Sequence, residues 1–302
     1  MPDHEVLIQV QYSDLNYKDG LSATGNKGVS PHYPFIPGVD ASGIVIEDRS
    51  GTYSKGDKVV VTGYDLGQST PGGFGGYIRV PSGWIVPLPE AMALHDAMIQ
   101  GTPAFTAAYG VMRLLHMDIK PENGRVLVTG ATGGVGSFAV YYLAREGFEV
   151  TASTGKLNKS DYLKSLGAKE VIHRDAFYGQ SSKPLLKGTW QAAFDTVGGE
   201  TLDTVIRQLA HNGTVVCCGN IGGHKVESSI YPFILRGVGL LGVDSSNTLM
   251  PKRKKIWAFM EQHFDPVMRN WATEIGLDEL EENLMEALSG KRSGPVVLRH
   301  QH

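Results

Sequence analysis

The segment from Arg125 to Gly136, RVLVTGATGGVG, limits the possible folds of this chain more than any other. Its first half is apolar and β-branched, which predicts a buried strand, and its second half is a glycine-rich turn. The composition of residues 137–145 predicts a helix. Together these elements form a pyrophosphate site, because glycines admit phosphates to the backbone and a helix N-terminus offers free N–H groups. We predict that four residues of this dinucleotide site bind the phosphates: Thr132, Gly133, Gly134 and Val135.

The glycine pattern departs from the usual G-x-G-x-x-G fingerprint at one position. Ala131 stands where the first glycine is usual, and Gly133 and Gly136 follow at the expected spacing. An ordinary tight turn between a strand and a helix is the alternative interpretation. The strand before the turn and the helix after it favour the dinucleotide site.

The end of the next predicted strand, residues 149–152, indicates which dinucleotide binds. An NAD site usually carries Asp or Glu about 20 residues beyond the glycine turn, where it bonds the ribose 2′-hydroxyl. Here the chain continues with Ser153, Thr154, Gly155 and Lys156, which offer hydroxyls and an ammonium but no carboxylate. These groups suit a 2′-phosphate. We therefore predict NADPH, bound by Ser153, Thr154 and Lys156; a solvated loop lysine is the alternative for Lys156.

Composition and charge exclude several classes of protein. Lys and Arg number 28 against 31 Asp and Glu, a net charge of −3, so nothing favours a nucleic acid or an anionic membrane as partner. No apolar run is long enough to predict a transmembrane helix, and the polar N-terminal residues are unlike a signal peptide. The two cysteines, Cys217 and Cys218, are neighbours that rarely pair, which fits a reducing compartment. We expect a cytoplasmic protein with both cysteines in its core.

Two domains are predicted from the changing pattern along the chain. Residues 1–100 contain short β-branched runs separated by Gly, Pro and Asp, which is typical of a barrel-like β domain. Residues 101–249 alternate strands and helices, which is typical of a doubly wound parallel sheet. Residues 250–302 contain helical stretches and a terminal strand, and we assign them to the first domain. The predicted fold class is α/β.

The predicted helices of the second domain are residues 137–145, 159–166 and 201–209. A glycine follows each of them, as is common where helices end. These glycines are Gly147, Gly167 and Gly213.

Further candidate cofactor residues follow the later predicted strands. Ligands of open α/β sheets bind at the carboxyl ends of strands, and Thr196 and Gly219 lie at two such ends. Val243 and Ser245 follow the last strand, and we predict that they meet the nicotinamide carboxamide, largely through backbone atoms. Turn formation alone is the alternative for Thr196 and Gly219.

Seven segments carry a family resemblance: 13–19 (SDLNYKD), 34–40 (PFIPGVD), 130–137 (GATGGVGS), 162–168 (YLKSLGA), 194–198 (FDTVG), 232–236 (PFILR) and 242–245 (GVDS). In this combination they resemble the medium-chain dehydrogenase/reductase superfamily. The most similar branch is the zinc-free, quinone-oxidoreductase-like YhdH/YhfP group, which includes acryloyl-CoA reductases. The resemblance implies a Rossmann domain, a GroES-like catalytic domain and NADPH-dependent reduction of a carbon–carbon double bond conjugated to a carbonyl.

The resemblance also implies site residues in the first domain. It places Tyr17 beside the nicotinamide ribose, where its hydroxyl reaches the cofactor or the substrate carbonyl; a core aromatic is the alternative. Asn16 is a candidate donor to a carbonyl, and we expect Lys18 and Asp19 to form an ion pair. The zinc ligands of zinc-dependent relatives fall in the Asn16 region and on residues 38–40, where neither Cys nor His stands. No metal is therefore expected.

We predict a zinc-independent reductase that transfers hydride from NADPH to the β-carbon of an α,β-unsaturated carbonyl. The substrate expected first is a short enoyl-CoA such as acryloyl-CoA, and hydrogen-bond donors must stabilise the enolate oxygen. A quinone or enone oxidoreductase is one alternative, and a catalytically impaired NADPH-binding protein is another. The apolar segment 239–243 is expected to pair across a homodimer.

Three further features lead to separate expectations. Family members begin with an additional strand and hairpin, which predicts an exposed edge strand at residues 5–10 or an incomplete first domain. Gly294 and Pro295 stand where the family has Gly-Arg, and Arg292 is the candidate substitute. The basic run 252–255 is interpreted as a solvated helix face, with contact to coenzyme A phosphates as the alternative.

Overall fold

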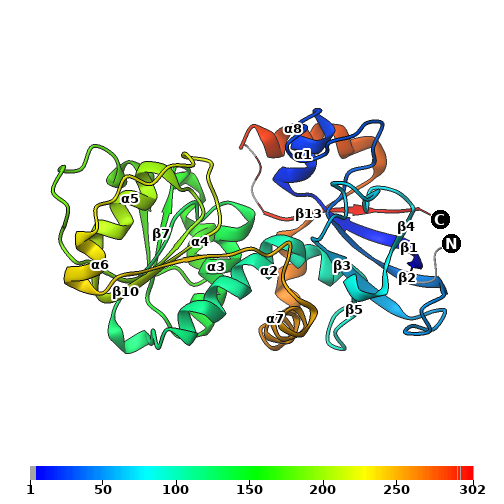
Figure 1. Cartoon of the computed structure of the whole chain (residues 1–302), viewed down its shortest axis with the longest axis horizontal. Coiled ribbons are helices and arrows are strands. Elements are labelled where there is room, and N and C mark those ends of the chain that lie inside the picture. Colours follow the sequence, from blue (N-terminus) through cyan, green and yellow to red (C-terminus); the bar gives the residue numbers. More distant parts are fainter. Residues whose placement is uncertain (1–4, 291, 293, 302) are drawn as a thin grey trace. The chain divides into compact units, whose positions relative to one another are not determined.

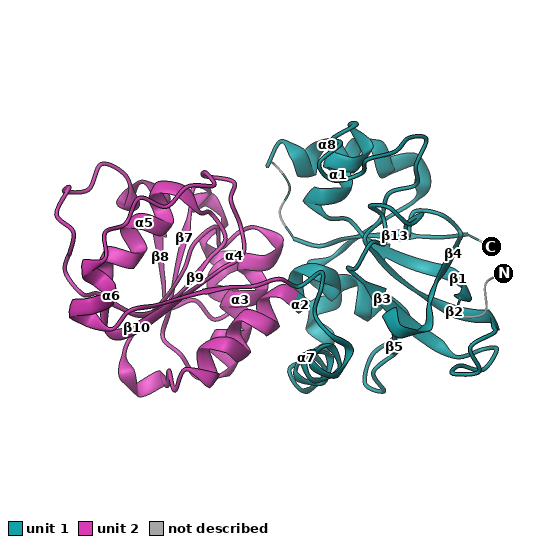
Figure 2. Cartoon of the chain, in the orientation of Figure 1, with its two compact units in different colours: residues 1–105, 245–302 teal, residues 106–244 magenta. Residues whose placement is uncertain are grey.

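The computed structural model describes residues 5–290, 292 and 294–301. The chain forms two compact units (Figure 2). The first unit comprises Met1–Phe105 and Ser245–His302, and the second comprises Thr106–Asp244. The sequence predicts boundaries after residues 100 and 249, whereas the chain passes between the units after Phe105 and Asp244.

The second unit contains six strands: β6 (Val126–Val128), β7 (Val150–Thr154), β8 (Glu170–His173), β9 (Trp190–Asp195), β10 (Leu209–Cys217) and β11 (Gly239–Gly242). They form one sheet in the order β11-β10-β9-β6-β7-β8, and the described pairings are parallel. This is the doubly wound nucleotide-binding order, so the predicted fold class is confirmed. The strand order reverses between β6 and β9, and ligands of such sheets bind beyond the carboxyl ends at that point.

Four α-helices connect these strands: α3 (Gly134–Arg145), α4 (Ser160–Ser165), α5 (Gly199–Gln208) and α6 (Tyr231–Arg236). Gly147 and Gly167 follow α3 and α4 with φ of +86° and +106°, the left-handed conformation that glycine supplies where helices end. The expectation that Gly213 also ends a helix is wrong. The helix α5 passes directly into β10, and Gly213 lies inside that strand.

The described residues of the first unit form seven strands: β1 (Glu5–Asp14), β2 (Asp40–Asp48), β3 (Lys58–Thr62), β4 (Tyr77–Pro81), β5 (Ile85–Pro87), β12 (Thr273–Ile275) and β13 (Val296–Arg299). They pair in the order β12-β13-β1-β2-β3-β5, and β4 also pairs with β1. The strand β1 has β2 on one side, and β4 and β13 in succession on the other. The expectation of an exposed edge at this strand is therefore wrong.

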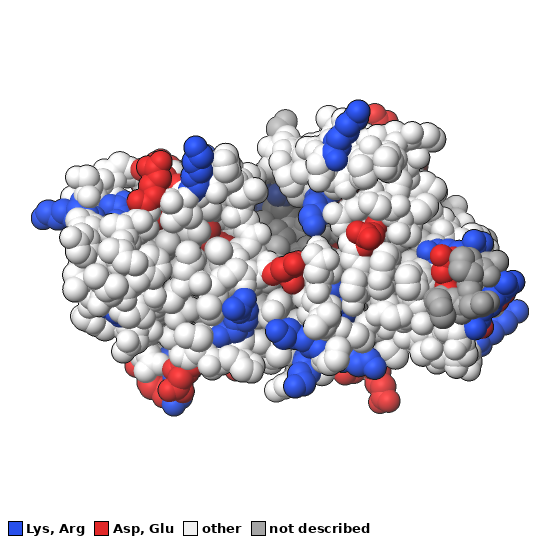
Figure 3. Space-filling view, viewed as in Figure 1, with Lys and Arg blue, Asp and Glu red and all other residues white. Residues whose placement is uncertain are grey.

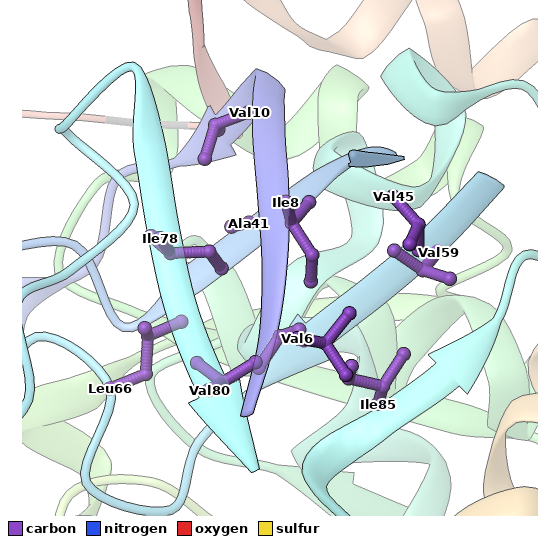
Figure 4. Close-up of a cluster of buried hydrophobic side chains, with 11 residues drawn as sticks. Val6, Ile8, Val10, Ala41, Val45, Val59, Leu66, Ile78, Val80 and Ile85 are labelled. Atoms are coloured by element: carbon purple, nitrogen blue, oxygen red, sulfur yellow. The ribbon is translucent and has the colours of Figure 1, made fainter. Parts of the chain in front are cut away.

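The sheet of the first unit curls around an apolar core (Figure 4). Val6, Ile8 and Val10 alternate along β1 and point inward, as the two-residue period of a strand requires. They meet apolar residues of β2, β3, β4 and β5. The buried members from these strands include Ala41, Val45, Val59, Val61, Ile78, Val80 and Ile85.

Helices α1 (Tyr17–Ala23), α7 (Met250–Gln262) and α8 (Leu280–Leu288) belong to the first unit, and α2 (Leu94–His116) spans the passage between the units. Helices α1 and α8 lie side by side (Figure 1) because Gly20 has no side chain; a Cβ there would lie 2.7 Å from the Leu288 side chain. The sequence did not predict α2. Gly101 and Pro103 interrupt it, and burial of most of its surface removes the amphipathic period.

Short 3₁₀ helices connect the longer elements: η1 (Ser82–Trp84), η2 (Pro121–Asn123), η3 (Leu157–Lys159), η4 (Arg174–Phe177), η5 (Pro266–Trp271) and η6 (Leu277–Glu279). None of the helices in the described ranges is long and apolar enough to cross a membrane. Acidic and basic side chains are interspersed over the face in Figure 3, without a continuous basic field.

Candidate functional site

The glycine-rich turn joins β6 to α3 at the carboxyl edge of the parallel sheet. Gly130 has a φ of +59°, and a Cβ there would clash with Oγ1 of Thr196. A Cβ at Gly136 would clash with the carbonyl oxygen of Gly130, so the close approach of helix and turn also requires glycine. The N–H groups of Gly134 and Val135 lie in the first turn of α3, where no intrahelical acceptor exists. This geometry suits a pyrophosphate.

The turn is bonded directly to the end of β7, where the 2′-phosphate site is predicted. The hydroxyls of Thr132 and Thr154 lie 3.0 Å apart, and Thr154 Oγ1 accepts a hydrogen bond from the Lys156 N–H at 3.0 Å. The Ala131 N–H donates to the carbonyl oxygen of Ser153. Ser153 and Thr154 are buried, so Lys156 is the more accessible of the predicted 2′-phosphate residues. Burial, reinforced by Lys159, lowers the pKa of Lys156.

A second cation, which the sequence pattern did not predict, lies beside this segment. A Cβ at Gly155 would lie 2.9 Å from Nε of Arg174, so the guanidinium of Arg174 packs against the glycine that precedes Lys156. The exposed Arg174 directly follows β8, which pairs with β7 through Thr154 and His173. The only local signal for Arg174 in the sequence is that a basic residue directly follows the next strand after Lys156. Arg174 comes close to Gly155 only because β8 pairs with β7.

Asp195 and Thr196 bind the end of β9 to the end of β6. Thr129 Oγ1 donates to Asp195 Oδ1 at 2.6 Å, and the Gly198 N–H donates to Asp195 Oδ2 at 2.7 Å. Burial raises the pKa of Asp195. The Thr196 hydroxyl donates to the carbonyl oxygen of Thr129 at 2.9 Å. These bonds hold the two strand ends together where the strand order reverses. The Thr196 hydroxyl forms one of them, so it contributes to the turn.

An open cavity of about 600 Å³ lies at the carboxyl ends of β10 and β11. Gly219 and Val243 both line it, so the structure brings these two predicted cofactor residues together. A Cβ at Gly219 would clash with the carbonyl oxygen of Thr196. The complete lining consists of Tyr109, Arg113, Cys217, Cys218, Gly219, Asn220, Gly242, Val243 and Asp244.

The expectation that Cys217 and Cys218 lie in the core holds only in part, because neither is fully buried and only Cys217 is packed against the core cluster of the parallel sheet. Both cysteines are half-buried free thiols, and both line this cavity. Burial is the main cause that raises the pKa of each thiol, in Cys218 to about 12. They are therefore neutral thiols near neutral pH.

In the first unit, the turn after β1 holds the predicted residues Asn16 and Tyr17. Tyr17 begins α1 and its side chain is 49% exposed, so the alternative of a core aromatic is wrong. The next residue, Lys18, donates from Nζ to Ser246 Oγ at 3.2 Å. This bond places the first turn of α1 against the segment that carries Ser245. The structure thus brings Tyr17 and Ser245 onto neighbouring segments.

The Asn16 amide is oriented by two buried carboxyl groups. Its Nδ2 donates to Asp40 Oδ2 at 2.8 Å and approaches Asp14 Oδ2 at 3.4 Å. An amide nitrogen has only two hydrogens, and both are directed at carboxyl oxygens. In this geometry neither amide hydrogen points at a substrate site, and the donor role of Asn16 toward a carbonyl stays a prediction.

Asp14, Asp19 and Asp40 form a buried acidic cluster beneath Asn16. Burial is the first cause that raises the pKa of each, in Asp19 to about 7. Asp19 accepts from the N–H groups of Gly38, Val39 and Asn16, whereas the exposed Lys18 bonds Ser246. The ion pair expected between Lys18 and Asp19 is therefore wrong.

Arg292, in the C-terminal segment, interacts electrostatically with Asp14 and Asp19 of this cluster. Its Nη2 donates to the carbonyl oxygen of Leu15 at 2.6 Å. Burial lowers the pKa of Arg292, and the charges of Asp14 and Asp19 oppose that shift. Arg292 thus bonds the residue that follows β1 and lies near the acidic cluster, although it does not directly precede the terminal strand.

Within the described residues, no group of three or more His, Cys, Asp or Glu side chains can hold a metal ion. The features that do converge are a glycine turn at a helix N-terminus, basic groups beyond β7 and a cavity beyond β10. Combined with a β-rich unit of barrel type, they define a dinucleotide-binding protein with the architecture of a two-domain dehydrogenase.

Comparison with known proteins identifies the family. Residues 2–90 match the family described as "Alcohol dehydrogenase GroES-like domain", and residues 134–262 match "Zinc-binding dehydrogenase". The putative quinone oxidoreductase YhfP of Bacillus subtilis is 42% identical over 301 residues, covering 99% of this chain and 91% of the relative. The probable acrylyl-CoA reductase AcuI of Escherichia coli is 40% identical, covering 95% and 88%. The chain belongs to the medium-chain dehydrogenase/reductase superfamily, which confirms the predicted family and fold class.

Solved structures agree with this assignment. The yhdH oxidoreductase of Salmonella enterica, determined in complex with NADP, has a TM-score of 0.96 and 38% identity, covering 100% of this chain and 93% of that one. The yhfP protein of Bacillus subtilis, determined with NAD bound, has a TM-score of 0.95 and 42% identity, covering 99% and 92%. One of these two relatives was thus determined with NADP and the other with NAD.

Proposed function

We propose that this protein is an NADPH-dependent reductase of α,β-unsaturated carbonyl compounds, with a short enoyl-CoA as its substrate. The observation that carries the proposal is the packing of the Arg174 guanidinium against Gly155, the residue that directly precedes Lys156. No carboxylate stands between Ser153 and Lys156, where an NAD site usually has one. Guanidinium and ammonium groups favour a 2′-phosphate, and so NADPH over NADH.

When bound, NADPH supplies a hydride to the β-carbon of the acceptor, and a proton from solvent or a side chain completes the reduction at the α-carbon. The residues of the chain position the reactants and stabilise charge. The turn from Thr132 to Val135 holds the pyrophosphate, and the backbone at Val243 and Ser245 holds the carboxamide. Negative charge develops on the acceptor carbonyl oxygen, and the Tyr17 hydroxyl is the donor assigned to it or to the cofactor ribose. Asn16 is a positioning residue because its amide hydrogens point at Asp14 and Asp40.

The substrate class is supported by the relatives. AcuI of Escherichia coli, at 40% identity, is named a probable acrylyl-CoA reductase. A quinone or enone is the second candidate, because YhfP, at 42% identity, is named a putative quinone oxidoreductase. The two substrates share a conjugated carbonyl, so the same donor set serves either.

Steady-state NADPH oxidation with acryloyl-CoA, crotonyl-CoA and a simple quinone tests the substrate. We expect the highest kcat/KM with acryloyl-CoA. A higher value with the quinone would select the second candidate. Tight NADPH binding without turnover of any acceptor would refute a reductase and indicate an NADPH-binding protein.

Charge reversal tests the cofactor preference separately. Lys156→Glu and Arg174→Glu are each expected to lower the ratio of kcat/KM for NADPH to that for NADH by about tenfold or more, since one charge-assisted bond contributes about 1.5–3 kcal/mol. Lys164→Glu, an exposed lysine on α4, is the matched control and should leave the ratio unchanged. An unchanged ratio in both site variants would refute the 2′-phosphate site.

We also propose a homodimer that pairs through β11, the edge strand of the parallel sheet. Leu240 on this strand is 39% exposed, and exposed apolar side chains of Ile230, Ile234 and Leu235 lie on or beside α6. An apolar edge strand beside an apolar helix is a surface that association would cover.

We propose the cytoplasm as the location of the protein. The free thiols Cys217 and Cys218 support a reducing compartment.

A further inference from the structure

The basic run 252–255 contains one residue that is not solvated. Lys252, Lys254 and Lys255 are exposed on α7, as expected, but Arg253 has a relative exposure of 0%. It belongs to the inward stripe that continues with Ile256, Trp257 and Met260 at helical spacing. The expectation of a fully solvated helix face is therefore wrong at Arg253. A buried guanidinium is expensive unless its donors are satisfied, so its partners indicate its role.

The Arg253 guanidinium bonds the segment that begins where the chain re-enters the first unit. Its Nη2 donates to the carbonyl oxygens of Ser245 and Ser246 at 3.1 and 3.0 Å, and its Nε donates to that of Thr248 at 3.3 Å. Its Nη1 donates to the carbonyl oxygen and Oγ1 of Thr62, at the end of β3, at 2.8 and 2.9 Å. The planar guanidinium group of Arg253 thus fixes the path of residues 245–248 relative to the end of β3.

Two aromatic rings hold the guanidinium in place. Its carbon lies 4.3 Å from the ring centroid of Tyr64 and 4.8 Å from that of Phe105. Phe105 is the last residue of the first unit before the chain leaves it, and Ser245 is the first residue after it returns. Tyr64 is itself stacked on Trp84 at 5.1 Å, and its N–H donates to the carbonyl oxygen of Ser246. One side chain therefore contacts both points at which the chain passes between the units.

We infer that Arg253 is a positioning residue for cofactor binding. It holds Ser245 at the place where the nicotinamide carboxamide is proposed to bind, and Ser246 at the place where it bonds Lys18, next to Tyr17. Arg253 itself touches neither cofactor nor substrate. The inference depends on the proposed function, because it assigns Arg253 to the support of Ser245 and Tyr17 in that site.

Steady-state kinetics and direct NADPH binding of Arg253→Lys and Arg253→Gln test this inference. We expect Arg253→Gln to raise the KM and Kd for NADPH about tenfold or more, with kcat changed less than about threefold, since about 1.4 kcal/mol is tenfold. Arg253→Lys should recover part of the affinity, because an ammonium keeps the charge but cannot span carbonyl groups on both segments. A merely structural role would lower the active fraction, and with it the apparent kcat, without changing KM.

The control is Lys254→Gln, which removes an exposed charge one residue away and should leave KM unchanged. If Arg253→Gln does not fold, the KM and Kd of Arg253→Lys decide the question alone. Unchanged NADPH affinity in the folded variants would overturn the inference about Arg253 and leave the proposed function intact. Wild-type protein that binds no NADPH would instead refute the proposed function.

Discussion

Raising the pH from about 4 to about 8 should destabilise the first unit through Asp19. This carboxyl group is fully buried, and burial, partly offset by the Asn16 N–H, raises its pKa from 3.8 to about 7. Between these values the folded state keeps a proton that the unfolded chain has released, so the free energy of unfolding falls as pH rises. The stabilisation is complete below pH 3.8 and lost above about pH 7. At 1.36 kcal/mol per pH unit, the loss is about 4 kcal/mol.

The assay is urea unfolding at several pH values, followed by tryptophan fluorescence. Trp84, Trp257 and Trp271 belong to the first unit, so most of the signal reports on it. Burial also raises the pKa values of Asp14 and Asp40, so these groups add to the same trend in the wild type.

Asp19→Asn isolates the contribution of this one group. The variant loses the acceptor for one backbone N–H, which costs about 1–3 kcal/mol at low pH. It also loses the titration, so its stability should decline about 4 kcal/mol less than that of the wild type by about pH 8. Asp278→Asn, an exposed carboxyl group in the same unit, should follow the wild type. Parallel profiles for wild type and Asp19→Asn would refute the reasoning.

Three further substitutions have distinct expected outcomes. Tyr17→Phe should lower kcat/KM about tenfold through loss of one hydrogen bond, and unchanged kinetics would remove Tyr17 from the site. Gly136→Ala should weaken NADPH binding by more than about tenfold, because its Cβ displaces the phosphate turn, whereas Gly83→Ala, which has open space around it, should bind normally by fluorescence titration. Leu240→Arg should yield a monomer in light scattering, and Met285→Arg, on exposed α8, should not; a dimer in both would exclude β11 as the interface.

Much of the fold was predictable because its signals are local. Residues close in sequence determine the glycine turn, the helix after it and the alternation of strands and helices. This alternation in turn predicts that the strands of the sheet run parallel. The helix α2 was not predictable in the same way. Gly101 interrupts it with a φ of +47°, and burial on most sides removes the polar face that marks a surface helix.

The candidate site was predictable only in part. Thr132 and Thr154 were both predicted, but their hydrogen bond depends on the parallel pairing of β6 with β7. Arg174 was missed because it reaches Gly155 only through the pairing of β7 with β8. The bond from the Asn16 amide to Asp40, 24 residues away, could not be predicted because it depends on the packing of two distant segments.

The sequence by itself determined the family, the glycine turn and the absence of a carboxylate after β7, since each is a property of residue type at a local spacing. The tertiary structure alone decided which charged groups are buried. Arg253 belongs to a run of four basic residues, yet it is buried against two aromatic rings while its neighbours remain exposed. Asp19 is buried beside the exposed Lys18 for the same reason. Burial depends on which distant segments pack against a residue, and that packing is long-range.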